Sequence, residues 1–142
     1  TALSELGRPP LPVGVHSPGH VADTDEEALE QLWPAYSAVM GRIGRERGWP
    51  PMSRAEFAQQ AGPRGAIFAG SPETVARKIA ATVSALGLQR FDLKYSHGTL
   101  AHEKLMRSIE LYGTVVVPRV RELLAQASAQ AGAEADAGGD SA

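Results

Sequence analysis

The sequence of 142 residues contains no cysteine, which excludes disulfides, thiolate catalysis and cysteine-ligated zinc. Lysine and arginine together number 14 against 16 aspartates and glutamates, so no broad positive field favours a nucleic acid as partner. No apolar run approaches the roughly 18 residues that a membrane span needs, and no signal peptide is recognisable. These absences lead us to expect a cytoplasmic protein that binds neither nucleic acids nor membranes.

What the sequence does contain is centred on residues 66 to 98, which read as strand, turn, helix, turn and strand. Residues 66 to 69 form a short apolar run, typical of a strand buried on both faces. Ser71 is placed as a helix N-cap and Pro72 at the first helical position, and Gly87 is placed as the C-cap. Two strands joined by a helix predict a parallel, right-handed βαβ unit.

The helix of this unit carries an apolar face at helical spacing, formed by Val75, Ile79, Val83 and Leu86. A second strand is expected over residues 90 to 96, where apolar and polar side chains alternate. Units of this kind place their chemistry at the carboxyl ends of the strands. Here those ends are Gly70-Ser71 and Ser96-His97-Gly98.

The amino-terminal part predicts a strand over residues 11 to 22, although Pro12 and Pro18 weaken it because proline cannot donate to a strand ladder. If that strand is regular, His16, Pro18 and His20 share one face. Thr24 with Glu27 is a capping box for a helix, which Pro34 is expected to kink or split before Gly48 ends it.

The remaining segments are less regular. Ser53 with Glu56 predicts a second capped helix of about two turns, followed by a glycine-containing loop at 61 to 65. Thr99 is a candidate cap for a helix that Gly113 interrupts. Residues 115 to 124 predict a continuing helix, with a strand as the alternative because of three consecutive valines. Residues 128 to 142 lack large apolar side chains and are expected to form a flexible tail.

Several stretches together resemble the carboxyl-terminal part of the luciferase-like, flavin-dependent monooxygenase family. The resemblance is carried by the order and spacing of five blocks rather than by any single one. The blocks are VADTDEEA (21 to 28), ERGWPPMSRAEF (46 to 57), GAIFAGSPETVARKIA (65 to 80), RFDLKYSHG (90 to 98) and HEKLMRSIELYGTVVVPRV (102 to 120).

The resemblance implies the carboxyl-terminal portion of a TIM-like (β/α)8 barrel, with about three parallel strands and their crossover and closing helices. Residues 11–22, 66–69 and 90–96 would be strands six, seven and eight, and residues 49–65 an insertion that includes a lid. The partial barrel domain would span residues 1–127. Because a complete barrel typically needs about 250 residues, the chain resembles part of an enzyme whose five amino-terminal strands carry most flavin contacts.

For the intact enzyme the resemblance implies a monooxygenase that uses reduced FMN and O2 on a small organic substrate. A deazaflavin is the alternative cofactor, with NAD(P)H as a candidate indirect reductant. The isolated chain is expected to be inactive. A second hypothesis is a non-catalytic α/β module that folds by self-association or with a partner chain, and a third is a small independent enzyme with a metal or acid-base site.

Candidate site residues follow from the strand ends and from the resemblance. The catalytic candidates are His16, His20 and His97, which would line the barrel mouth. Arg64 in the lid and Ser96 after the last strand are candidates for substrate contact, and Gly70 and Ser71 for flavin phosphate. Each also has a structural interpretation, as a surface histidine, a solvated arginine, a helix-entry loop or an ordinary cap.

A metal site and an aromatic stacking site are not expected. The four histidines have no recognisable metal-ligand spacing. The large aromatic side chains are better explained as core or interface: Trp33, Tyr36, Trp49 and Phe57. Three strands cannot close a barrel, and strand edges left unpaired favour association. We therefore expect a homo-oligomer or a further barrel segment as partner.

Overall fold

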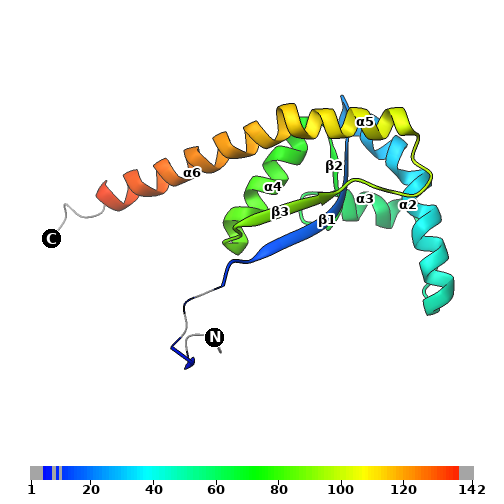
Figure 1. The fold of residues 1–142 in the computed structure, drawn as a ribbon, viewed down its shortest axis with the longest axis horizontal. Coiled ribbons are helices and arrows are strands. Elements are labelled where there is room, and N and C mark those ends of the chain that lie inside the picture. Colours follow the sequence, from blue (N-terminus) through cyan, green and yellow to red (C-terminus); the bar gives the residue numbers. More distant parts are fainter. Residues whose placement is uncertain (1–4, 8, 10, 138–142) are drawn as a thin grey trace.

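The computed structural model describes residues 5–7, 9 and 11–137 as an open α/β fold (Figure 1). Three parallel strands form one sheet: β1 (Gly14–Val21), β2 (Phe68–Gly70) and β3 (Arg90–Lys94). The three strands expected from the sequence are therefore present. Compared with the expected ranges, β1 is shorter, β2 begins two residues later, and β3 ends two residues earlier.

The central strand is β1, which pairs with both others in the order β2-β1-β3. Its residues Gly14 to Pro18 pair with β3, and Gly19 to Val21 pair with β2. Pro18 thus lies where the pairing changes from one neighbour to the other, the position at which a missing N–H group disturbs either ladder least. This explains why a strand with an internal proline occupies the middle of the sheet.

This strand order differs from the sequential order that a (β/α)8 barrel implies. In a barrel, strand seven would lie between strands six and eight. Here the strand expected to be number six, β1, lies between the other two, because its eight residues offer separate stretches to β2 and β3. The described chain consequently forms an open three-stranded sheet and not a closed barrel.

The first two helices begin and end as their caps predict. In α2 (Asp25–Arg47) the Thr24 side chain accepts from the Glu27 N–H, and Gly48 at φ 70° ends the helix. The reciprocal half of the expected capping box is missing there, because the Glu27 carboxylate binds Gln31 instead. Pro34 does not split α2, which runs through it as one helix. In α3 (Arg54–Ala61) both halves of the Ser53 capping box are present.

The crossover helix α4 (Pro72–Leu86) has the predicted Ser71 cap, the predicted proline in its first turn and the predicted Gly87 at φ 60°. Val75 and Ile79 are buried and Val83 is half-buried, as the apolar spacing requires. Leu86 is the exception, with 61% of its surface exposed.

The carboxyl-terminal helices run on from one another. α5 (His102–Leu111) begins after Ala101 with no side-chain cap, so the expected Thr99 cap is wrong. A π-helical turn, η1 (Tyr112–Val116), connects α5 to α6 (Val117–Ala137). The strand alternative for the valines is excluded, and Gly113 lies in the π turn. The segment from residue 128, expected to be a flexible tail, is helical as far as Ala137. Residues 138–142 lie outside the described residues.

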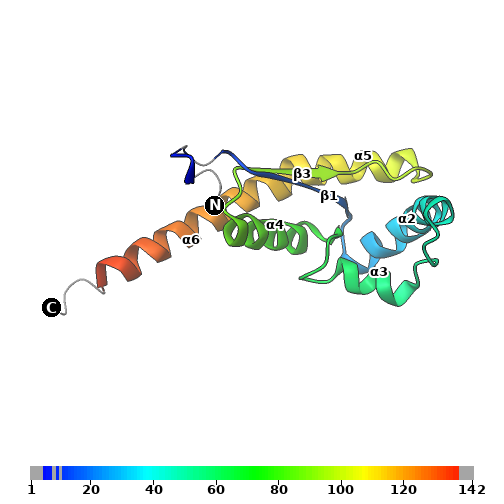
Figure 2. The same ribbon diagram turned by 90° about the horizontal axis from the view of Figure 1, so that it is seen from below.

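Two hydrophobic clusters hold the elements together. The larger joins β1 and β2 to α4, α5 and η1, through Val21, Phe68, Val75, Ala76, Ile79, Leu111 and Val116. The smaller joins α2 and α3 to β2, through Leu32, Phe57, Ile67 and Ala69. Figure 2 shows α4 against one face of the sheet, α2 and α3 gathered beyond the carboxyl ends of β1 and β3, and the end of α6 projecting away.

Candidate functional site

Two of the three candidate histidines meet near the carboxyl end of β1. His20 is completely buried, and its Nε2 lies 2.8 Å from Gln31 Oε1 on α2. His97, in the loop after β3, is 6% exposed and its Nε2 donates to the Gly19 carbonyl at 3.0 Å. Tyr36 contributes an edge-on contact to His97, with ring centroids 6.1 Å apart. The strand β1, the helix α2 and the loop after β3 therefore build this histidine cluster together.

The surroundings of both histidines favour the neutral form of the ring. Burial is the largest cause that lowers the pKa of His20, and the charge of Lys104 acts in the same direction, while Gln31 and Glu27 oppose it. Burial also lowers the pKa of His97, more than its contact with the Gly19 carbonyl raises it, and His20 lowers it further. A neutral imidazole keeps one acceptor nitrogen, as a general base requires.

His16 does not join this cluster. His16 is exposed on the half of β1 that pairs with β3, where it lies opposite Asp92. His20, four residues further along the strand, is buried. Strand alternation places both on one face, but only the carboxyl-terminal half of β1 is covered by α2 and α5. Alternation alone could not reveal where along the strand the helical cover begins.

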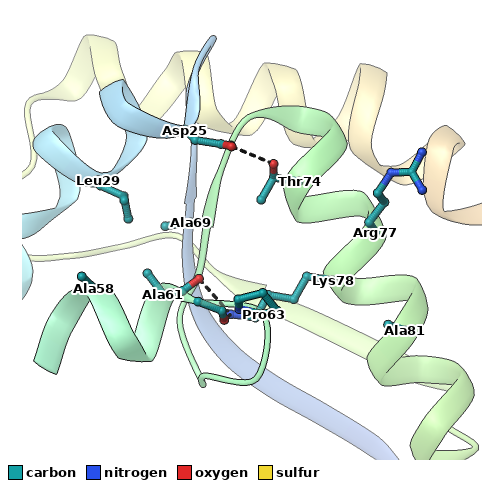
Figure 3. A pocket seen from close by; sticks show the side chains of 11 residues that line it. Asp25, Leu29, Ala58, Ala61, Pro63, Ala69, Thr74, Arg77, Lys78 and Ala81 are labelled. Carbon is teal, nitrogen blue, oxygen red and sulfur yellow. Dashed lines mark hydrogen bonds between the residues drawn. The ribbon is translucent and has the colours of Figure 1, made fainter. Parts of the chain in front are cut away.

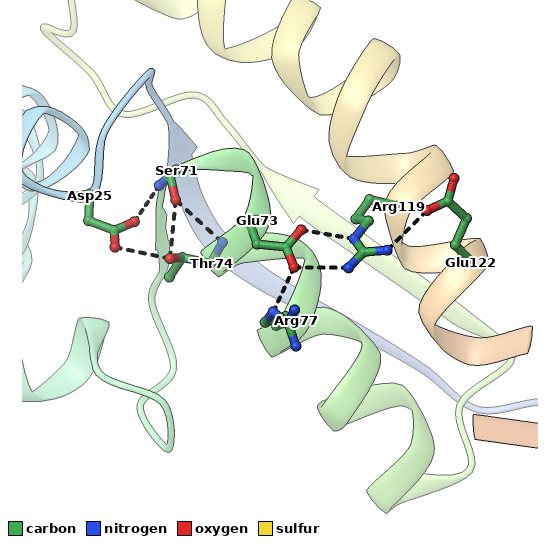
Figure 4. Close-up of polar contacts among 7 residues, drawn as sticks. All are labelled: Asp25, Ser71, Glu73, Thr74, Arg77, Arg119 and Glu122. Atoms are coloured by element: carbon green, nitrogen blue, oxygen red, sulfur yellow. Dashed lines mark hydrogen bonds and ion pairs between the residues drawn. The ribbon is translucent and has the colours of Figure 1, made fainter. Parts of the chain in front are cut away.

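The amino end of α4 does not fit the phosphate expected at Gly70 and Ser71. The Ser71 N–H donates to Asp25 Oδ1 at 2.6 Å, and the Thr74 hydroxyl donates to Asp25 Oδ2 at 3.0 Å (Figure 4). These contacts, above all the Ser71 N–H, lower the pKa of Asp25. A carboxylate of the chain itself thus occupies the donors that a phosphate would need, and its negative charge would repel one.

Gly70 is required by this arrangement. Its φ is +156°, and a Cβ there would lie 2.8 Å from Asp25 Oδ1 and 3.0 Å from the Thr74 side chain. Asp25, in the first turn of α2, is not among the residues that the sequence singled out for function. Its contact with the amino end of α4 joins residues 46 positions apart, so no local pattern could have shown it.

A cavity of about 510 Å³ lies between α2, α3 and α4 (Figure 3). Its wall is mostly apolar, formed by Leu29, Ala58, Ala61, Gly62, Pro63, Ala69 and Ala81, with four polar residues, Asp25, Thr74, Arg77 and Lys78. Of the residues that the sequence singled out for function, none lines this cavity. Arg64 lies exposed next to it, in the turn that supplies Gly62 and Pro63.

Lys78 is a buried ionisable residue in the wall of this cavity, and the sequence did not single it out. Only 9% of it is exposed, and its ammonium donates to the carbonyls of Gly62 at 2.6 Å, Ile67 at 2.7 Å and Ala61 at 3.2 Å. Burial lowers the pKa of Lys78 to about 8. The available signal was its position three residues after Val75, inside the apolar face of α4.

The other candidates have simpler surroundings. Ser96 is exposed, two residues beyond the end of β3. Among residues 5–7, 9 and 11–137, no group of three or more histidine, aspartate or glutamate side chains is arranged to hold a metal ion. No helix within the same described ranges is long and apolar enough to cross a membrane.

Comparison with solved structures finds the same fold in two monooxygenases. Monooxygenase RslO1 from Streptomyces bottropensis matches with a TM-score of 0.62 at 18% identity, over 82% of this chain and 34% of that one. The second is a Type II Baeyer–Villiger monooxygenase, the oxygenating constituent of 3,6-diketocamphane monooxygenase from Pseudomonas putida, in complex with FMN. It matches with a TM-score of 0.58 at 23% identity, over 84% of this chain and 37% of that one.

No protein-family model and no curated protein sequence matches the chain. The chain spans about a third of the length of the two monooxygenases. Its structural neighbours are thus monooxygenases, one of them with bound FMN, as the resemblance in sequence predicted. At 18% and 23% identity the likeness is one of fold.

Proposed function

We propose that the chain is part of a luciferase-like, flavin-dependent monooxygenase and that it forms the substrate and ring side of the flavin site. The observation that carries this proposal is the fold that the chain shares, over more than four-fifths of its length, with an FMN-bound monooxygenase. The buried histidines His20 and His97 near the carboxyl end of β1, whose pKa values burial lowers, support it. Such strand ends are where α/β folds bind ligands.

The residues of this chain would bind and orient the reacting groups. His20 would hold an acceptor nitrogen toward the substrate or the flavin ring and His97 would position the end of β1 beside it, with His16 and Ser96 nearer the solvent. Arg64 would close over an anionic group from its exposed turn. The cofactor, reduced FMN or a deazaflavin, would supply the oxidation chemistry, with NAD(P)H as its indirect reductant.

The flavin phosphate would be bound elsewhere, because Asp25 already occupies the amino end of α4. The proposal therefore includes a partner: further barrel strands or a second copy of the chain. A groove of about 220 Å³ along β3 and α5 supports it, since apolar side chains including Phe91, Leu93, Tyr95 and Ile109 line it. The cysteine-free composition remains the basis for expecting a cytoplasmic location.

The test uses the protein isolated at its natural length from its source organism. Denaturation should release a flavin, identified by its fluorescence, and the native protein should consume O2 when reduced FMN is supplied. The isolated 142-residue chain should quench FMN fluorescence weakly or not at all. Absence of any flavin together with absence of O2 consumption would overturn the proposal.

A non-catalytic α/β module is the second candidate, favoured by the filled amino end of α4. It predicts that the natural-length protein also carries no flavin while still forming a defined assembly. Sub-micromolar FMN binding by the isolated chain would exclude this candidate and would show that the described residues form a cofactor site by themselves.

A further inference from the structure

The ring of His20 has one nitrogen that is engaged and one that is not. Nε2 is 2.8 Å from the Gln31 side-chain oxygen. Nδ1 is buried and has no hydrogen-bond partner in the part of the chain that the structure describes. An orphaned buried acceptor costs about 1–3 kcal/mol, so this arrangement calls for a physical reason.

The tautomer of His20 follows from the chain of contacts that leads to it. The Glu27 carboxylate accepts a hydrogen bond from Gln31 Nε2 at 2.5 Å, and an ionised carboxylate can only accept. The amide of Gln31 must therefore turn its NH2 group toward Glu27 and its oxygen toward His20. The His20 nitrogen that faces this oxygen must then be the donor, so the neutral ring carries its proton on Nε2.

Helix geometry favours this contact chain. Glu27 and Gln31 are four residues apart on α2 and so lie on the same side of the helix. The charged groups that face His20 are Glu27 on α2 and Lys104 on α5, with the neighbouring imidazole of His97 from the loop after β3. Lys104 and burial oppose a second proton on the ring.

We propose that Glu27 and Gln31 are positioning residues that hold His20 as the neutral Nε2–H tautomer. Nδ1 is thereby kept as a bare acceptor for a hydroxyl or N–H group of a ligand, which would reach it by displacing part of the cover that buries His20 in this conformation. The ligand role rests on the proposed function, whereas the tautomer is a property of the chain alone. A fixed acceptor of this kind would orient a polar substrate group without competing for a proton.

The first test is nuclear magnetic resonance of the chain labelled with ¹⁵N-histidine, without flavin. Two-bond correlations between ring C–H protons and ring nitrogens distinguish the two tautomers, and His20 should show Nε2–H. The variant Glu27→Lys places a group there that can only donate, so it should turn the Gln31 amide and lower the Nε2–H population of His20. Glu26→Lys is the matched control, with the same charge change one residue earlier, and should leave the tautomer unchanged.

Two results would overturn the positioning role: an Nδ1–H tautomer in the parent chain, or equal spectra for Glu27→Lys and Glu26→Lys. Because no flavin is involved, this outcome is decided whether or not the natural-length protein proves to be a monooxygenase.

The second test separates the two nitrogens in the natural-length enzyme. Asparagine carries its amide near the place of Nδ1, whereas glutamine reaches the place of Nε2. His20→Asn should therefore retain a turnover at least about tenfold higher than His20→Gln, the equivalent of one hydrogen bond of about 1.4 kcal/mol. His20→Gln should be the more stable variant, since it keeps the contact with Gln31. Equal turnover of the two variants would overturn the acceptor role of Nδ1.

Discussion

Replacement of Lys78 by methionine tests whether the buried ammonium holds the turn before β2 in place. Methionine keeps the length of the side chain and its packing in α4 but removes all three donors. The carbonyls of Ala61, Gly62 and Ile67 then lose their common partner. The end of α3, the turn and the start of β2 would no longer be tied to α4.

The magnitude follows from the burial of each carbonyl. The contact with the Ile67 carbonyl is fully buried, and an acceptor left unsatisfied there costs about 1–3 kcal/mol. The Ala61 and Gly62 carbonyls are partly accessible, so water can replace the ammonium and the loss is smaller. Relief of the buried charge offsets this loss at pH 7, so the deficit of Lys78→Met is clearest above the folded pKa of about 8, where we expect the free energy of unfolding to fall by about 2 kcal/mol.

The assay is urea unfolding followed by circular dichroism, with Arg77→Met as the control. Arg77 is the adjacent residue on α4 and is exposed, so its solvent-screened ion pair with Glu73 contributes little to stability. If Lys78→Met were as stable as Arg77→Met, the three contacts would have no measurable role and our reasoning would be refuted.

The same pair of proteins predicts a dependence on pH. The folded pKa of Lys78 is about 8 and its ordinary value 10.5, so between these values the unfolded chain binds more protons than the folded one. The parent chain should therefore gain stability as pH rises through this window. Lys78→Met lacks this gain, so the difference in unfolding free energy between the parent and Lys78→Met should grow as pH rises through this window.

Four further predictions concern other parts of the fold. Arg64→Ala should impair turnover of the natural-length enzyme while changing unfolding free energy by less than about 0.5 kcal/mol; a large stability loss with unchanged kinetics would contradict it. Gly19→Ala should destabilise by about 1–3 kcal/mol, because its Cβ would lie 2.3 Å from Leu93 and 2.5 Å from the Phe68 carbonyl, whereas Gly41→Ala in α2 should not destabilise. Asp25→Ala should be less stable than the parent at pH 7, and this difference should shrink as pH falls below 3.8, since the lowered pKa of Asp25 means that its ionised form stabilises the fold; a difference independent of pH would argue against it. Sedimentation equilibrium at micromolar concentration should find a dimer or larger assembly, and a monomer that unfolds cooperatively would contradict the partner proposal.

Local chemistry explains what the sequence could predict. Helix caps depend on a few adjacent residues, so Ser53, Ser71 and Gly87 could be placed correctly from their neighbours alone. The same holds for the strands, whose apolar runs are short and bounded by turn residues. The one failed cap, Thr99, lies in a loop whose path is set by His97 binding back to β1.

Contacts between distant segments explain what could not be predicted. The position of β1 between the other strands depends on pairing across more than 70 residues in the case of β3. The engagement of Ser71 by Asp25 and of Lys78 by three carbonyls depends on how α2, α3 and α4 meet. The candidate site combines the two. His20 and His97 were candidates from the sequence, whereas the contact of Gln31 with His20 depends on how α2 packs against β1.

The π-helical turn from Tyr112 to Val116 sets the rotational phase of everything after it. Leu111 and Val116 are both buried in the same cluster although they are five residues apart, a spacing that a regular α-helix would turn to different sides. The wide turn absorbs one additional residue. α6 thereby arrives with Arg119 facing the first turn of α4, where it donates to Glu73 at 2.8 and 3.1 Å. A shortening of the chain by one residue at this point would rotate the whole of α6 by about 100°, so this turn fixes the direction in which the last helix faces any partner.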